Sequence, residues 1–279
     1  MKRTTYIFIG LLVSGLMVIV ATIIFISMSG KPYREDVNFG GDEQVTMDLN
    51  GVHVVKVFVS QDGVPEERHV FVNGEMKIES IFTSVGKEQI SYPKGKYLNV
   101  IQKNDTLFMK LDFSSKNISD KYHNRGFIYS TGFDVKLAVD SLAGIITDTD
   151  GLKLNLKGID TDSLFVRGRY NILLDSCQIH SLDIQGNRLE FRARNSIIEN
   201  FYLNLDGVWK WTFENTEVGT EYLSGSDRHS NNLQKGECKR VVWTPLTGDA
   251  RLQVNVREKA AITTVSYTHL RAHETSQDL

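Results

Sequence analysis

The chain has 279 residues, of which 41% are hydrophobic and 24% charged, so it is long and apolar enough to fold around a sizeable core and is not a disordered protein. Its formal net charge of −2 provides no long-range positive field that would attract the phosphates of a nucleic acid. We therefore expect no nucleic-acid partner.

The first element is an apolar stretch. Tyr6 to Met28 contains no charged side chain and, as a helix, is long enough to cross a bilayer core of about 30 Å. Lys2 and Arg3 precede it, which favours a cytoplasmic N-terminus. Residues 1–30 are therefore predicted to form a cytoplasmic tip and a transmembrane anchor. A cleaved signal peptide is the alternative, but the apolar region of such a peptide is usually shorter.

Two regions follow the anchor. Residues 31–44 are polar and contain glycine, as is typical of a short spacer. Residues 45–126 contain short runs rich in Val, Ile and Phe with turn residues between them, which predicts a β-meander of antiparallel strands. Within it, Asn73-Gly74 predicts a two-residue hairpin.

A second turn is predicted in the same region at Asn104-Asp105. Apolar residues alternate strictly along the strand after it, so these side chains should share one buried face. They are Leu107, Met109, Leu111 and Phe113.

A repeat marks the region 127–262. When position 163 is laid over position 181, "SLFVRG" from Ser163 aligns with "SLDIQG" from Ser181, and a third copy contains "FYLNLDG". Such a repeat predicts strands that bury their apolar faces by stacking. The expected inner columns are Leu164, Leu182 and Leu203, and Val166, Ile184 and Leu205. The outward column is Arg167, Gln185 and Asp206.

The predicted fold class is therefore all-β: a transmembrane helix, a β-meander and a stacked β-solenoid resembling a β-helix. An antiparallel β-sandwich is the alternative, because one such repeat is also as long as two strands at ordinary spacing.

The segments "VHVVKVFVSQ", "NDTLFMKLDF", "SLFVRG", "SLDIQG" and "FYLNLDG" together resemble the bacterial adhesin-head family known as the GIN domain. The resemblance covers about residues 45–262. It implies a β-helical cell-envelope protein. Together with the apolar stretch, it predicts a single-pass protein of the bacterial inner membrane with the bulk of the chain periplasmic or extracytoplasmic. It implies no catalytic residue, because the family has none established.

Residues 263–279 are expected to be a non-native tail. Val265 to Thr275, "VSYTHLRAHET", resembles a translated sequencing adapter, so its two histidines are given no chemical role.

The polar residues that could bind a metal or take part in catalysis do not form a recognisable site. Cys177 and Cys238 are expected to be free, with Cys177 buried in the position that Ile159 occupies one repeat earlier. The aspartates near one repeat lack the further ligands of a calcium loop and are interpreted as turn formers. The histidines lack the spacing of a zinc site. We expect no metal, no cofactor and no catalytic residue. These aspartates are Asp148, Asp150, Asp160 and Asp162, and the histidines are His53, His69, His123, His180 and His229.

Trp209, Trp211 and Phe213 alternate and are expected to face inward, although outward rings would form a platform for sugars. The predicted function is a non-enzymatic module that presents a rigid surface to a protein or glycan partner. The alternative is a carbohydrate-active enzyme that uses Asp183 and Asp206, because glycoside hydrolysis requires two carboxylates in one groove.

Overall fold

A computed structural model describes residues 3–29, 36–40, 43–63, 69–83, 86–119, 122, 126–233, 238–256 and 263–266. The chain divides into two compact units, residues 1–36 and 37–279. The segments 31–35, 41–42 and 257–262, His123 and the tail after residue 266 lie outside the described residues.

The first unit contains one α-helix. Helix α1, Arg3–Ser29, is continuous because its residues are apolar and no proline interrupts them. Its segment Tyr6–Phe25 is long and apolar enough to cross a membrane, and none of it is buried against protein. Such a helix meets the requirements of either a membrane anchor or a signal sequence.

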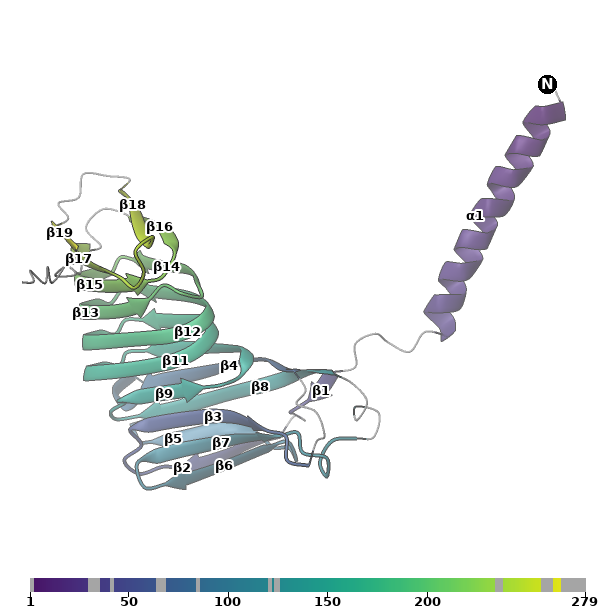
Figure 1. Cartoon of the computed structure of the whole chain (residues 1–279). Helices are drawn as coiled ribbons and strands as arrows, with labels where there is room; N and C mark the ends of the chain where they lie inside the picture. Colours follow the sequence, from purple (N-terminus) through teal and green to yellow (C-terminus); the bar gives the residue numbers. More distant parts are fainter. Residues whose placement is uncertain are drawn as a thin grey trace, which may run out of the picture. The chain divides into compact units, whose positions relative to one another are not determined.

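The second unit is an all-β protein built on a curled mixed sheet that contains 17 of its described strands, while two further strands pair separately (Figure 1). The strands are β1 Asp36–Asn38, β2 Gln44–Asp48, β3 Val54–Ser60, β4 His69–Ser80, β5 Gln89–Pro93, β6 Leu98–Lys103, β7 Thr106–Asp112, β8 Phe127–Val139, β9 Gly144–Thr147, β10 Asp150–Lys157, β11 Asp160–Asp175, β12 Gln178–Arg194, β13 Ile197–Asn204, β14 Val208–Glu214, β15 Glu217–Gly225, β16 Arg228–Leu233, β17 Cys238–Pro245, β18 Arg251–Val256 and β19 Thr263–Ser266. A short 3₁₀ turn, η1, covers Ile81–Thr83.

The strands of the C-terminal half pair in parallel. Leu164 of β11 pairs with Leu182 of β12, the register that the alignment of "SLFVRG" with "SLDIQG" predicts. In Figure 1, β11, β12, β13, β15 and β17 lie one beside the next. The predicted third members of both inner columns, Leu203 and Leu205, are wrong. Leu182 pairs with Phe201 and not Leu203, and Ile184 pairs with Leu203 and not Leu205. The third copy is therefore shifted by two positions from the alignment of similar letters.

Left-handed backbone positions recur in two series along these strands, and we call them corners. Strand segments alternate with a corner of one series and then the other, so the chain turns sharply between segments. One series is Gly132, Gly151, Tyr170, Arg188 and Gly207, and the other is Gly158, Ser176, Asn195 and Asn215, all with positive φ. In the second series Asn215 Nδ2 donates to Asn195 Oδ1 at 2.8 Å, and Asn195 Nδ2 donates at 3.4 Å to Oδ1 of Asp175, the residue before Ser176.

The region predicted as an antiparallel meander is mixed instead. β3 pairs in parallel with β7 and β9, and β4 pairs in parallel with β8 and β10, whereas β2–β5, β5–β8 and β6–β7 are antiparallel. Short runs of β-branched residues occur in both kinds of pairing, so composition alone does not set the direction.

The hairpin predicted at Asn73-Gly74 is wrong, because β4 runs through it. A Cβ at Gly74 would lie 2.1 Å from the carbonyl oxygen of Phe133, so the glycine permits close strand approach at a register shift. The turn at Asn104-Asp105 is confirmed, with β6 and β7 antiparallel on either side.

One apolar core runs through the second unit. The alternating residues that follow the Asn104-Asp105 turn are all buried, as predicted, and they join the same core as Leu164 and Leu182. Val37 and Phe39, within the expected spacer, also pack in this core. Residues on both sides of position 126 therefore contribute to one compact unit.

Candidate functional site

An open groove of about 620 Å³ lies on the outer face of β12, β13, β15 and β17. Because these strands are parallel and in register, residues at equivalent positions form columns across them. One column bears Asp183, Tyr202 and Tyr222. The other bears Asn204, Ser224 and Thr244, with Gln185 at the β12 end of the groove.

Two tyrosine rings form the apolar side of the groove. The rings of Tyr202 and Tyr222 are stacked, with centroids 4.6 Å apart and planes 7° from parallel. Tyr202 remains 39% exposed, so this small ladder is accessible from solvent. The strands between which it forms are held at the normal inter-strand spacing, so the rings are pre-positioned by the backbone.

The polar column supplies short side chains with both donors and acceptors. Asn204, Ser224 and Thr244 carry an amide and two hydroxyls, which present hydrogen-bonding groups without a positive charge. No lysine or arginine is among the residues that line the groove in the described part of the chain. The groove therefore combines ring surface with neutral and acidic hydrogen-bonding groups.

The structure brings Asp183 and Asp206, the pair named in the enzymatic alternative, to the same groove. Burial raises the pKa of Asp183, and the amide of Gln185, 3.3 Å away, partly offsets this effect. The pKa of Asp206 is lowered, mainly because the backbone N–H of Ser226 donates to Oδ1 at 2.9 Å. The Ser226 hydroxyl donates to Oδ2 at 2.8 Å, so both carboxylate oxygens of Asp206 bind the residue that directly follows β15.

The prediction that Trp209, Trp211 and Phe213 all face inward is wrong for Trp209. Trp211 and Phe213 are buried, whereas Trp209 is 67% exposed. The reason is a register shift in β14: Leu189 pairs with Val208, but the next pair is Glu190 and Lys210. Trp209 is the extra residue of this bulge, so simple alternation does not apply to it.

The remaining candidates hold structural positions. Cys177 is buried as predicted, and both cysteines are free thiols. Asp150 is nearly buried between His69 Nε2 at 3.1 Å and Arg169 Nη1 at 2.9 Å, an ion-pair arrangement and not a turn cap. Among the residues that the structure describes, no group of three His, Cys, Asp or Glu side chains is placed to hold a metal ion.

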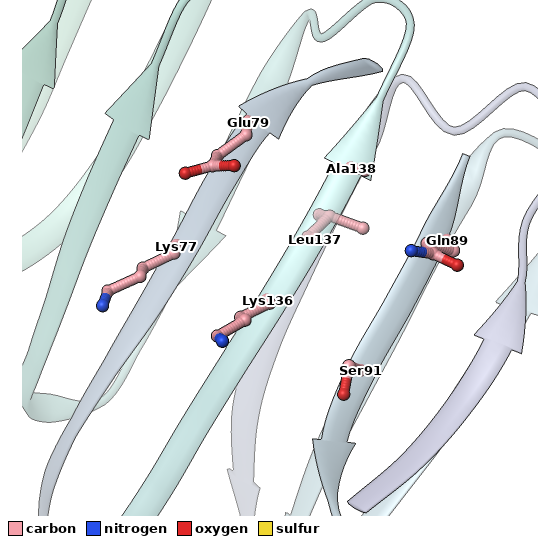
Figure 2. Close-up of a pocket in the computed structure, with 7 residues that line it drawn as sticks. All are labelled: Lys77, Glu79, Gln89, Ser91, Lys136, Leu137 and Ala138. Carbon is pink, nitrogen blue, oxygen red and sulfur yellow. The ribbon is translucent and has the colours of Figure 1, made fainter. Parts of the chain in front are cut away.

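A second concavity, of about 330 Å³, lies on the outer face of β4, β8 and β5 (Figure 2). Its neighbouring lysines, Lys77 and Lys136, are directly opposite in register. Lys77 also lies 3.3 Å from a carboxylate oxygen of Glu75, and Glu79 is part of the lining. Positive and negative groups therefore alternate here, and no aromatic ring is among the lining residues in the described chain.

Sequence reasoning missed the tyrosine ladder. Its signal is the pair "FYL" and "EYL", in which Tyr202 and Tyr222 hold the same place in successive repeats. Aligning the third repeat on its leucines is a separate error, which places Asp206 and not Asn204 beside Gln185.

No protein-family model matches this chain, and no curated protein matches it. Solved structures resemble it at low identity. Two are described as "putative adhesin", from Bacteroides fragilis and Parabacteroides distasonis, with 12% and 11% identity. Each covers 83% of this chain and 100% of its own, with a TM-score of 0.43. A "putative cell adhesion protein" from Clostridium sporogenes has 10% identity, covers 80% of this chain and 98% of its own, and has a TM-score of 0.22. These are distant neighbours, and their names alone say nothing of what this chain binds.

Proposed function

We propose that this protein is a binding module of the bacterial envelope whose groove on β12, β13, β15 and β17 takes a neutral glycan. The observation that carries the proposal is the stacked pair of Tyr202, which is exposed, and Tyr222, which is half-buried, beside a column of amide and hydroxyl groups. Sugars expose apolar C–H faces and a rim of hydroxyls, so ring surface and neutral hydrogen-bonding groups complement them together. The absence of lysine and arginine from the described lining favours a neutral ligand over an acidic one.

The proposed context is a single-pass protein of the inner membrane, anchored by α1, with the β-unit in the periplasm. The apolar segment Tyr6–Phe25 supports this. We further propose that the parallel strands form a β-solenoid of the GIN-domain type. The in-register pairing of successive repeats and the two series of left-handed corners support it. The groove would then lie along a rigid stack and face away from its core.

The test is calorimetric titration of the full chain, in detergent, with neutral oligosaccharides of glucose, mannose, galactose and N-acetylglucosamine. We expect at least one class to bind, and Tyr202→Ala and Tyr222→Ala each to weaken binding about tenfold. Phe82→Ala is the matched control, because Phe82 is 84% exposed and is not among the groove residues. Absence of binding by all four classes, or equal affinity of the tyrosine variants and wild type, would disprove the proposal.

A second candidate is glycoside hydrolysis in the same groove. It is favoured by one observation: Asp183 and Asp206 line one groove and their pKa values are shifted in opposite directions, as in acid–base pairs. The bonds from Ser226 to both oxygens of Asp206 count against a free nucleophile or base. Release of reducing ends by wild type, abolished in Asp183→Asn, would establish this candidate; binding without release would exclude it.

A further inference from the structure

A row of aromatic rings crosses the outer face of the β-unit, apart from the groove. Tyr129 of β8 stacks on Phe71 of β4 with centroids 5.0 Å apart. Phe71 meets Tyr170 of β11 edge to face at 5.6 Å, and Tyr170 meets Trp209 of β14 at 6.1 Å. The row is therefore continuous from β8 to β14 and ends on the most exposed ring, since Trp209 is 67% exposed.

The row spans strands that contribute no ring. At Gly151 of β10, a Cβ would lie 2.5 Å from the ring of Phe71, so only glycine leaves room for this ring to lie across the strand. At the corresponding corner of β12 stands Arg188, exposed and between Tyr170 and Trp209 in strand order.

The left-handed backbone of this corner series is unfavourable for two of its residues, because they have a Cβ. The corner series uses glycine three times, at residues 132, 151 and 207, but the chain has Tyr170 at φ 70° and Arg188 at φ 56°. Residues with a Cβ are strained in this left-handed region, where glycine is not. Such strain persists where the side chain is needed for another purpose, so a non-glycine residue with positive φ is a candidate for a functional role. Tyr170 belongs to the aromatic row, and Arg188 lies on β12, the strand between those of Tyr170 and Trp209.

The charge of Arg188 is uncompensated within the described chain. No carboxylate there lies within ion-pair distance of it, although Arg167, Arg169, Arg192 and Arg194 on the same strands each have an acidic partner. An exposed arginine on the strand between the half-buried ring of Tyr170 and the exposed ring of Trp209 suits a ligand that has a carboxylate together with flat apolar faces.

We propose that Tyr129, Phe71, Tyr170, Trp209 and Arg188 form a second site that binds an acidic glycan, with sugar faces on the rings and a sugar carboxylate on Arg188. The site is independent of the neutral-glycan groove, which has a different ring pair and no basic lining residue in the described chain. A neutral glycan would leave Arg188 without a partner, and a simple anion would leave the rings unused.

The test uses three acidic oligosaccharides, oligogalacturonate, oligomannuronate and oligosialic acid, titrated against the full chain in detergent. Each has a control in which its carboxylates are reduced to alcohols. We expect at least one acidic oligomer to bind, its reduced form to bind about tenfold more weakly, and its affinity to fall with added salt. Trp209→Ala should weaken binding about tenfold, because a Trp side chain that a ligand covers is frequently a hot spot.

Arg188→Gly is the sharpest variant. It removes the charge and also relieves the left-handed strain, so binding of the acidic oligomer should fall about tenfold while the urea midpoint stays equal or rises. Tyr202→Ala should leave acidic binding unchanged, which separates this site from the groove. The proposal is overturned by absence of binding by all three acids, by equal binding of the reduced forms, or by unchanged affinity in both Arg188→Gly and Trp209→Ala.

Discussion

Leu182→Ala tests the stacking of the parallel strands most directly. Leu182 is fully buried, and its register neighbours, Leu164 on one side and Phe201 on the other, are also fully buried. Removing three carbon groups loses about 2.4 kcal/mol of transfer free energy. Both neighbours belong to hydrogen-bonded strands that cannot collapse freely into the space, so a cavity remains and the total should reach about 3–4 kcal/mol.

The assay is urea unfolding of the full chain in detergent, followed by tryptophan fluorescence, to which the buried ring of Trp211 contributes. Gln185→Ala is the control, because Gln185 lies in the same strand, three residues on, with its side chain exposed. It should change the free energy of unfolding by no more than about 0.5 kcal/mol. Equal losses for the two variants would refute the assignment of inner and outer faces.

Three further outcomes are expected. Arg194 lowers the pKa of Asp175 through a 2.9 Å ion pair, so Asp175→Asn should reduce the free energy of unfolding at neutral pH. The ion pair stabilises the fold only while the carboxylate is ionised. The difference in free energy of unfolding between variant and wild type should therefore close as the pH falls below about 4 and through the lowered folded-state pKa. Burial raises the pKa of the Cys177 thiol, so Ellman's reagent should modify it only after unfolding, and fast modification of the native chain would contradict its position. Gly74→Val should prevent native folding, since its Cβ would overlap the carbonyl of Phe133; a soluble variant with wild-type circular dichroism and urea midpoint would show that the close approach is not required.

The sequence predicts strand register most reliably where a short repeat recurs without a change in length. The register of Leu164 with Leu182 follows from such a period, because a strand that slips by one residue exposes its apolar face. The same reasoning fails at the next step. Aligning similar letters there places Leu203 beside Leu182, 21 residues on, whereas partners on β12 and β13 are 19 residues apart and Leu203 lies beside Ile184. Similar letters can therefore recur out of register, at a place where the length of the repeat changes.

Two other errors have the same origin in local irregularity. Trp209 lies in a bulge, and counting by twos from Phe213 gives the wrong face. Asn73-Gly74 has the composition of a tight turn, yet its glycine serves a close approach between strands, a role that needs the same lack of a side chain. The groove is predictable only in part: the sequence alone points to Asp183 and Asp206, whereas the tyrosine ladder depends on the register of β13 with β15.

The corner residues with positive φ determine where this protein can change in length. A one-residue insertion inside a strand moves every following side chain of that strand to the opposite face of the sheet, so apolar side chains become exposed to solvent. An insertion at a corner leaves the strands on both sides in phase. Leu164 pairs with Leu182, Leu182 with Phe201 and Phe201 with Glu221, so the spacing of partners along the chain increases by one position at each of these steps while the strands stay in register. New outer surfaces can thus arise by lengthening the bends, while the straight segments keep their hydrophobic order.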